Sequence, residues 1–130
     1  MVSGKRDRMR YQVFDQKSVK IQSPAVTVSP SGRIYINQTA AELLMDKNAT
    51  EVLLLWDEGS ETAAMKPVHG DVRAYRIAYS HKGSGATITA KSFLNWIGYI
   101  DLGVGTITVP ANWNRRQGML EFAIPLGNEE

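Results

Sequence analysis

The sequence predicts an α+β fold that is mostly β, a small barrel in which two related halves of the chain interlock. Short segments of alternating apolar and polar residues are separated by turn signals rich in Gly, Pro and Asn, which is the pattern of half-buried strands. The order expected in residues 21–70 (strand, strand, helix, strand, strand) recurs in residues 71–126. Neither half is large enough to bury its own apolar faces, so we expect the two halves to share one core.

A single domain is expected over residues 21–126, because a chain of 130 residues has the length of one ordinary domain. Residues 1–20 are polar and basic and are expected to form a flexible N-terminal arm. Such an arm either tracks phosphates or is an ordinary solvated terminus, and the sequence leaves both open. Residues 127–130 are expected to form a short tail.

The first half opens with a predicted hairpin, in which Ala25–Ser29 and Arg33–Ile36 alternate on either side of a Pro-Ser-Gly turn. Asn37 follows directly, and an Asn side-chain oxygen is a favoured helix N-cap. The apolar period then changes from two residues to about 3.6, which predicts a helix over Gln38–Met45. Strand and helix are therefore joined without a linker.

A second hairpin is predicted after this helix. Glu51–Asp57 holds the continuous apolar run Val-Leu-Leu-Leu-Trp, which is typical of a strand buried on both faces. The chain turns at a Glu-Gly-Ser sequence and returns over Thr62–Lys66, ending at Pro67. His69–Asp71 is predicted to be the junction with the second half.

The second half repeats this order with weaker signals, and Gly85 stands where the first half has Gly32. A helix is predicted over about Ala90–Ile97 with Thr89 as its cap, and its apolar face includes Trp96. Trp56 and Trp96 are both assigned to the core. The predicted strands of this half are Ala74–Ser80, Ala86–Thr89, Thr106–Val109 and Met119–Ile124.

Residues 111–118 are polar and rich in turn signals, so they are predicted to form a loop. The loop combines Arg115 and Arg116 with amide side chains and Trp113, a composition that suits contact with nucleic acid or with a protein. The alternative is a simple hairpin turn whose Trp113 folds back onto the core.

A family resemblance rests on three features of the first half: the strand Gly32–Ile36 (Gly-Arg-Ile-Tyr-Ile), the capped short helix, and the hairpin closing on Met65–Val68 (Met-Lys-Pro-Val). Together they resemble the AbrB/MazE (SpoVT-AbrB) swapped-hairpin family. The resemblance implies that two such units interleave their hairpins into one barrel. Both units would lie in this one chain, as in tandem MraZ-type members, giving a monomeric pseudo-dimer or a homodimer. It also implies binding of double-stranded DNA, as a transcription regulator or an antitoxin.

Charge is distributed in bands, since residues 1–40 carry seven Lys or Arg and two Asp or Glu, whereas residues 41–71 carry two and seven. Arg33 is the one basic residue that also matches the family's motif. The alternative function is a protein-interaction or structural module of the same fold that has lost DNA binding and uses Trp113 as its contact. The acidic first hairpin favours this alternative if it shares a face with the basic groups. The residues predicted to contact DNA phosphates are Arg33, Arg73, Arg76, Lys82, Arg115 and Arg116.

No catalytic, metal or cofactor site is expected, so the chain is not predicted to be an enzyme. It contains no Cys, and His69 and His81 lack the spacing of metal ligands. No apolar run approaches the roughly 20 residues of a membrane span, and no signal peptide is visible. A cytoplasmic protein without membrane contact is therefore expected.

Overall fold

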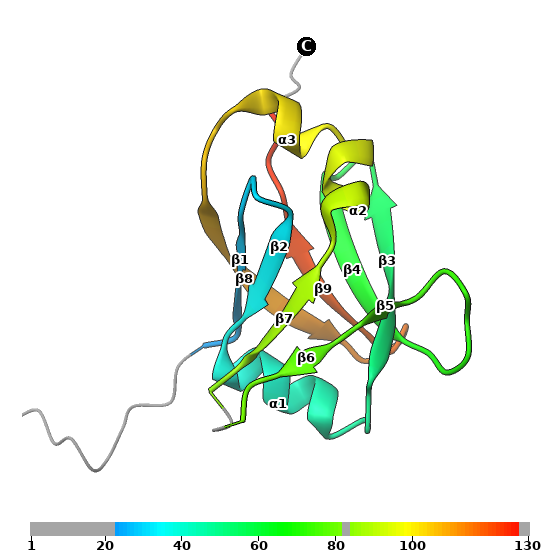
Figure 1. Ribbon diagram of the computed structural model, residues 1–130. Coiled ribbons are helices and arrows are strands. Elements are labelled where there is room, and N and C mark those ends of the chain that lie inside the picture. Colours follow the sequence, from blue (N-terminus) through cyan, green and yellow to red (C-terminus); the bar gives the residue numbers. More distant parts are fainter. Residues whose placement is uncertain (1–22, 82–83, 128–130) are drawn as a thin grey trace, which may run out of the picture.

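The computed structural model describes residues 23–81 and 84–127 (Figure 1). The predicted N-terminal arm, Lys82 and most of the predicted tail lie outside these residues.

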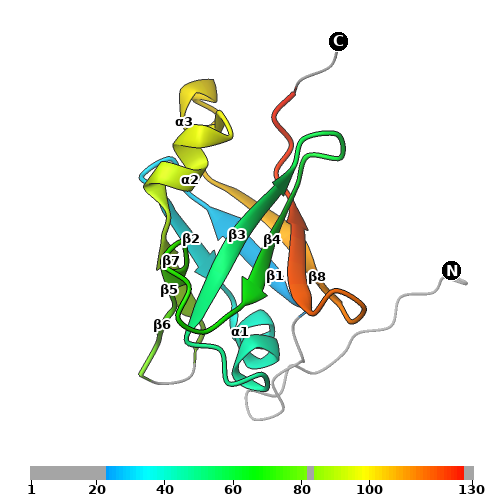
Figure 2. The ribbon, with the colours of Figure 1, turned by 90° about the vertical axis from the view of Figure 1, so that its right-hand side faces the viewer.

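The fold is mostly β, as predicted, and consists of one nine-stranded antiparallel sheet that curls into a nearly closed barrel (Figures 1 and 2). The strands are β1 (Ala25–Val28), β2 (Arg33–Ile36), β3 (Glu51–Asp57), β4 (Thr62–Pro67), β5 (Tyr75–Arg76), β6 (Ala78–Tyr79), β7 (Ala86–Thr89), β8 (Ile107–Asn114) and β9 (Met119–Ala123). The helices are α1 (Gln38–Met45), α2 (Lys91–Trp96) and α3 (Tyr99–Leu102). α1 lies at one end of the barrel, and α2 and α3 lie at the other (Figure 1).

The order of strands in the sheet is β5-β3-β4-β9-β8-β1-β2-β7-β6. Its two edge strands, β5 and β6, are separated in the chain by Ile77 alone. β5 pairs with β3, while β6 pairs with β7. The segment Tyr75–Tyr79 therefore bridges the two edges and brings the sheet round into a ring.

Pairing runs repeatedly between residues before and after position 70. β2 pairs with β7 through Ile34 and Ile88, and β4 pairs with β9 through Met65 and Leu120. β1 pairs with β8, and β3 pairs with β5. Apart from hairpin partners, every strand except β6 borders a strand from the other half of the chain, so the two halves share one sheet.

Asn37 fixes the junction of β2 and α1, as its position in the sequence predicts. Its Oδ1 accepts hydrogen bonds from the backbone N–H of Ala40 (3.0 Å) and of Ala25 (3.1 Å), and its Nδ2 donates to the carbonyl of Ser23 (2.9 Å). One carboxamide thus caps the helix and ties it to the beginning of β1. Ala40, Ala41 and Leu44 then point from α1 into the core.

The core fills the barrel with side chains from both halves. Ile34 and Ile88 face each other across β2 and β7, and both are fully buried. Tyr99 of α3 closes one end of this core at 1% exposure. Its hydroxyl lies within hydrogen-bonding distance of the carbonyl oxygens of Val28 (3.0 Å) and Gly105, so α3, which the sequence did not predict, is held on the barrel by a buried polar contact.

The prediction that β3 is buried on both faces is wrong. Val52 is fully buried, but Leu55 on the opposite face is 38% exposed. No helix covers β3 on the outside of the barrel (Figure 2). A continuous apolar run predicts burial on two faces only where a second layer is present, and a barrel of this size has a single layer.

Two predictions for α2 are also wrong. Thr89 is the last residue of β7 and not a cap, and the N-cap residue, Ala90, makes no side-chain cap. Trp96 was assigned to the core but is 72% exposed. The buried face runs through Ala90, Phe93, Leu94 and Ile97 at i, i+3, i+4 and i+7, so Leu94 takes the buried position and Trp96 lies off this face.

β8 is longer than predicted and includes Asn112 to Asn114, which were assigned to a loop. The turn is confined to residues 115–118. Trp113 consequently sits on a strand, half-buried and packed against the core. The Lys47 ammonium lies 5.7 Å from the centroid of its ring, a cation–π distance.

Gly85 offers a test of how tightly the two halves fit. Its φ is +131°, and a Cβ placed on it would lie 2.4 Å from the carbonyl oxygen of Ile36 in the other half. Gly85→Ala should therefore lower the free energy of unfolding by about 2–4 kcal/mol, through backbone strain plus the clash. Urea denaturation measures the change.

Gly118→Ala is the matched control, because its φ is +67° and no atom lies within 4 Å of the added methyl. We expect a loss of only about 1–2 kcal/mol from the left-handed backbone. Equal losses for the two variants would contradict the close approach at Gly85.

Candidate nucleic-acid interface

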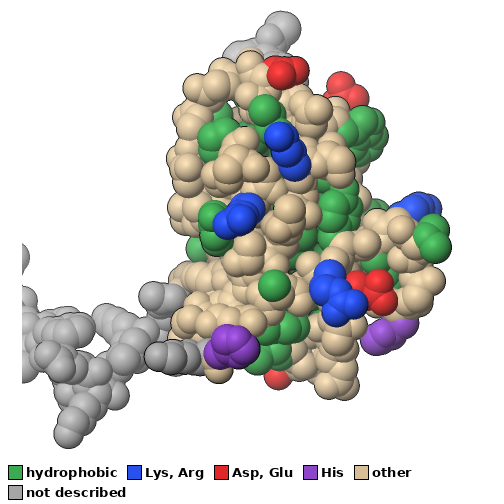
Figure 3. All heavy atoms as spheres, viewed as in Figure 1, with side chains coloured by type: hydrophobic (Ala, Val, Ile, Leu, Met, Phe, Trp, Pro, Cys, Tyr) green, Lys and Arg blue, Asp and Glu red, His purple; other side chains and the backbone are tan. Residues whose placement is uncertain are grey.

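One wall of the barrel is free of acidic residues. The five consecutive strands β8, β1, β2, β7 and β6 contain no Asp or Glu. β2 contributes Arg33, which is exposed and pairs with Thr89 of β7. We call the outer surface of these strands the acid-free wall. It faces the viewer in Figure 3, where Lys and Arg side chains stand out from mostly uncharged polar atoms.

Lys91 joins Arg33 on this wall. A Cβ placed on Gly32 would lie 2.6 Å from the Cβ of Lys91, so the lysine side chain starts directly over the residue that precedes Arg33. The backbone supports this approach, because the Ala90 N–H donates to the Gly32 carbonyl at 2.7 Å. Neither cation has an ion-pair partner in the part of the chain that the structure describes. Two cations without a described ion-pair partner therefore start from neighbouring parts of the backbone.

A row of polar side chains crosses the middle of the acid-free wall. The register places Thr108, Thr27, Tyr35 and Thr87 next to one another on four adjacent strands. The hydroxyls of Thr27 and Thr108 share a hydrogen bond of 2.8 Å. Tyr35 is 40% exposed, so part of its ring remains available for stacking.

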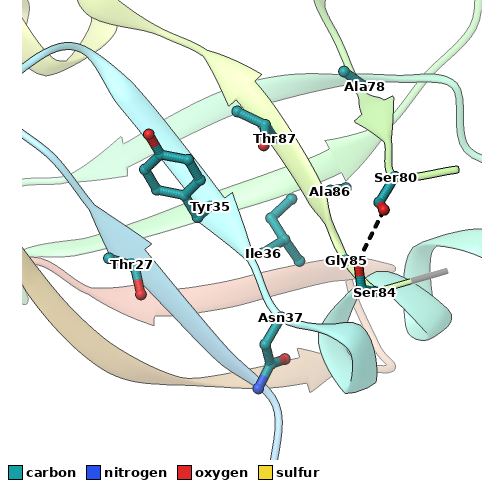
Figure 4. A pocket seen from close by; sticks show the side chains of 10 residues that line it. All are labelled: Thr27, Tyr35, Ile36, Asn37, Ala78, Ser80, Ser84, Gly85, Ala86 and Thr87. Atoms are coloured by element: carbon teal, nitrogen blue, oxygen red, sulfur yellow. Dashed lines mark hydrogen bonds between the residues drawn. The ribbon is translucent and has the colours of Figure 1, made fainter. Parts of the chain in front are cut away.

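Beside this row the wall is hollowed by an open cavity of about 330 Å³. Thr27, Tyr35 and Thr87 point into it from three strands (Figure 4). Ser80 and Ser84 also line it, at the right of Figure 4, and their hydroxyls share a hydrogen bond of 2.9 Å. The lining offers hydroxyl groups and an aromatic ring but no carboxylate, which suits phosphate and sugar oxygens better than a cation.

Arg115 and Arg116 lie far from Arg33. β8 starts beside Val28, close to the β1–β2 turn, and ends at Asn114, directly before the two arginines. The rise of an eight-residue strand is roughly 25 Å. Only Ile107–Pro110 of β8 pair with β1, whereas Ala111–Asn114 pair with β9. Arg115 and Arg116 therefore stand beyond the wall on the β8–β9 turn, where both are exposed.

Arg73 and Arg76 differ from each other in their availability. Arg73 makes a two-point interaction with Asp71, in which Nε donates to Oδ1 (3.0 Å) and Nη2 donates to Oδ2 (2.8 Å). Asp71 therefore occupies the guanidinium that the sequence predicted to contact phosphate. Arg76 is exposed on β5, next to the closing segment of the barrel. Lys82 lies outside the described residues.

The acidic first hairpin lies on the opposite side of the barrel. β4 and β2 are opposite each other in the ring of strands, with β9, β8 and β1 between them on one side. The turn that carries Glu58 and Glu61 lies beside the end of β9, since the Ile124 N–H donates to the Glu61 carbonyl (2.9 Å). Arg115 precedes the beginning of β9, at the other end of the same strand. The acidic groups therefore do not face the basic turn.

Two other features, a cluster of metal ligands and a membrane-spanning helix, are absent from the described residues. Within residues 23–81 and 84–127, no three His, Cys, Asp or Glu side chains gather as metal ligands would. No helix among these residues is both long and apolar enough to cross a membrane.

Comparisons of the chain with protein-family models, with curated proteins and with solved structures found no match. The resemblance to the AbrB/MazE family therefore stays a prediction.

The sequence pointed to Arg33 but missed Lys91 and the threonine row. Alternation in Arg33–Ile36 already places Arg33 on an outer face. Lys91 reaches it only because β2 pairs with β7, and a single sequence gives little information on pairing between distant strands. The threonines were visible as β-formers, but their alignment depends on the same register.

The Asp71–Arg73 pair gives a test by titration. The hydrogen bonds from the Arg73 side chain lower the pKa of Asp71 from 3.8 to about 2. A depressed carboxyl pKa contributes to stability above the unfolded value and loses that contribution as the pH falls through about 2. An NMR titration of the Asp71 carboxyl should therefore show a midpoint near 2.

Arg73→Gln should return this midpoint toward 3.8. Arg116→Gln is the control and should leave it unchanged. A normal midpoint in the unsubstituted protein would mean that Arg73 is free in solution to contact other anions.

Proposed function

We propose that this protein binds double-stranded DNA through the phosphate backbone, as a transcription regulator or an antitoxin-like protein. The observation that carries the proposal is the acid-free wall with its unpaired cations Arg33 and Lys91. Cationic side chains on a surface without carboxylates attract phosphate and release the counterions condensed on DNA. In this proposal the chain is a binding protein rather than an enzyme, needs no cofactor and works in the cytoplasm.

The pairing of the strands supports the resemblance of the fold to the AbrB/MazE swapped-hairpin family. β1 and β2 form one hairpin and β3 and β4 another, yet in the ring each pair borders strands of the other half. β6–β7 and β8–β9 are arranged in the same way. We therefore propose a swapped-hairpin barrel made of two repeats in one chain, in which the pseudo-dimer is monomeric.

The pattern of buried residues supports the internal repeat if the second half is aligned one residue further along than the match of Gly32 with Gly85. Gly32 and Gly85 are an odd number of residues apart, so aligning them would match inward-facing Ile34 with outward-facing Thr87. Matching Ile34 with Ile88 instead keeps buried positions on buried ones.

The basic residues that the structure describes have different roles in the proposed DNA contact. Arg33 and Lys91 form the main phosphate contact, near α2, and Arg115 and Arg116 supply a second contact at the far end of β8. Arg76 stands at the edge of the wall. Arg73 contributes little, because Asp71 already neutralises it.

The alternative function is a protein-interaction module. The sequence assigned its contact to Trp113, but the structure favours Trp96 for this role. Trp113 packs against the core, whereas Trp96 is 72% exposed. An exposed Trp of this kind is more typical of a protein contact than of a phosphate contact.

The salt dependence of binding to random duplex DNA tests the phosphate contact proposed for Arg33 and Lys91. Log affinity should fall with log salt concentration by about 0.9 per phosphate contact. The double variant Arg33→Gln, Lys91→Gln should weaken binding to every sequence and flatten this slope by about one to two units. Arg73→Gln should leave affinity and slope unchanged, because that arginine is already paired.

A second double variant tests the basic β8–β9 turn. Arg115→Ala with Arg116→Ala should also flatten the slope by about one to two units, without loss of stability, since both side chains are exposed. Absence of binding to duplex DNA at low salt would overturn the proposal. If only the Arg115 and Arg116 variant lost affinity, the acid-free wall would not be the interface.

A further inference from the structure

α2 presents an aromatic side chain to solvent at the end of the barrel opposite α1. Phe93 points into the core at 4% exposure, while Trp96 one turn later is 72% exposed. The two rings are tilted by 46° with centroids 6.2 Å apart, so the Trp96 ring rests against Phe93 on one side only. Large apolar side chains left this exposed commonly mark a contact surface.

Trp96 borders a hollow of about 190 Å³ between α2, the end of β3 and the chain after β9. Trp56, Ile97 and Leu126 supply its apolar lining, and Glu58 places a carboxylate at its side. Acidic and hydrophobic side chains lie next to each other at the upper right of Figure 3, where the outer ends of α2 and β3 meet. The hollow thus combines apolar walls with negative charge.

The negative charge of this hollow is not neutralised locally. Apart from Lys91 at the first position of α2, the segments that form it, residues 50–65, 91–114 and 117–127, contain no Lys or Arg. Glu61 strengthens the effect: its Oε1 accepts from the Leu126 N–H (3.2 Å), but its Oε2 is buried without a hydrogen-bond partner. Glu61 does not itself line the hollow, but its carboxylate adds negative charge beside Leu126 that no described ion-pair partner neutralises.

We propose that this hollow docks an arginine-bearing basic segment of a partner protein. The guanidinium stacks on the free face of Trp96 and pairs with the Glu58 carboxylate, while its aliphatic stem covers Ile97 and Leu126. Arginine suits the site better than lysine, because its planar group stacks on an aromatic ring and forms forked hydrogen bonds to a carboxylate. This contact is separate from the proposed DNA interface and does not depend on it.

The test uses the full chain and two fluorescein-labelled peptides, hexaarginine and hexalysine, with binding followed by fluorescence anisotropy. Hexaarginine should bind more tightly than hexalysine. Trp96→Ala and Glu58→Gln should each weaken hexaarginine binding by about threefold or more, and Trp96→Phe should retain part of the affinity. Glu42→Gln, which removes an exposed carboxylate of α1 at the other end of the barrel, is the matched control and should have no effect.

Equal binding by Trp96→Ala and the unsubstituted chain would overturn the proposal, as would equal affinity for the two peptides. A variant with Lys5, Arg6, Arg8 and Arg10 all changed to Gln tests whether the chain's own basic residues occupy the hollow. If the peptide binds only to this variant, the hollow is occupied by the chain itself and the proposal of a partner protein is overturned. Trp96→Ala should leave duplex DNA binding unchanged, so failure here is distinguishable from failure of the proposed DNA interface.

Discussion

The closure of the sheet around Ile77 is the constraint on which the rest of the structure depends. Ile77 is 6% exposed between β5 and β6, and its N–H donates to the carbonyl of Thr50 at 3.0 Å, where the chain enters β3. Because one five-residue segment pairs with β3 at one end and β7 at the other, the sheet keeps little free edge. Opening this junction would expose one edge of β3 and one edge of β7, while the strands from β3 round to β7 would keep their pairing with one another.

Closure also decides where charge can be displayed. A barrel this small fills its interior with side chains, so every second residue of each strand must face solvent. The outward positions of β1, β2 and β7 are taken by Ala, Thr, Tyr and Arg, whereas the β3–β4 hairpin carries Asp57 and Glu58 at its turn. Since β2 and β4 are opposite each other in the ring, the strand order separates the basic surface around Arg33 from the acidic β3–β4 turn.

The two ends of the barrel differ because their helices differ. α1 has eight residues, a side-chain cap from Asn37 and three side chains in the core. α2 has six residues and no side-chain cap, and it is followed at once by α3, which the buried Tyr99 holds in place. The face of α2 that packs on the barrel contains Phe93 and Leu94, and Trp96 lies off this face in solvent. One fold therefore offers a polar cationic wall and an aromatic, acidic end.

The sequence by itself determined the local elements. β2, α1, β3 and β7 have the predicted bounds, because alternation, the cap at Asn37 and the glycine turns act over a few neighbouring residues. The tertiary structure decided the exposure of Leu55 and Trp96, the place of Trp113 on a strand, and the meeting of Lys91 with Arg33. Each of these depends on which distant strand or helix lies alongside. Such pairing is set by the packing of the whole ring, and local periodicity contains no information about it.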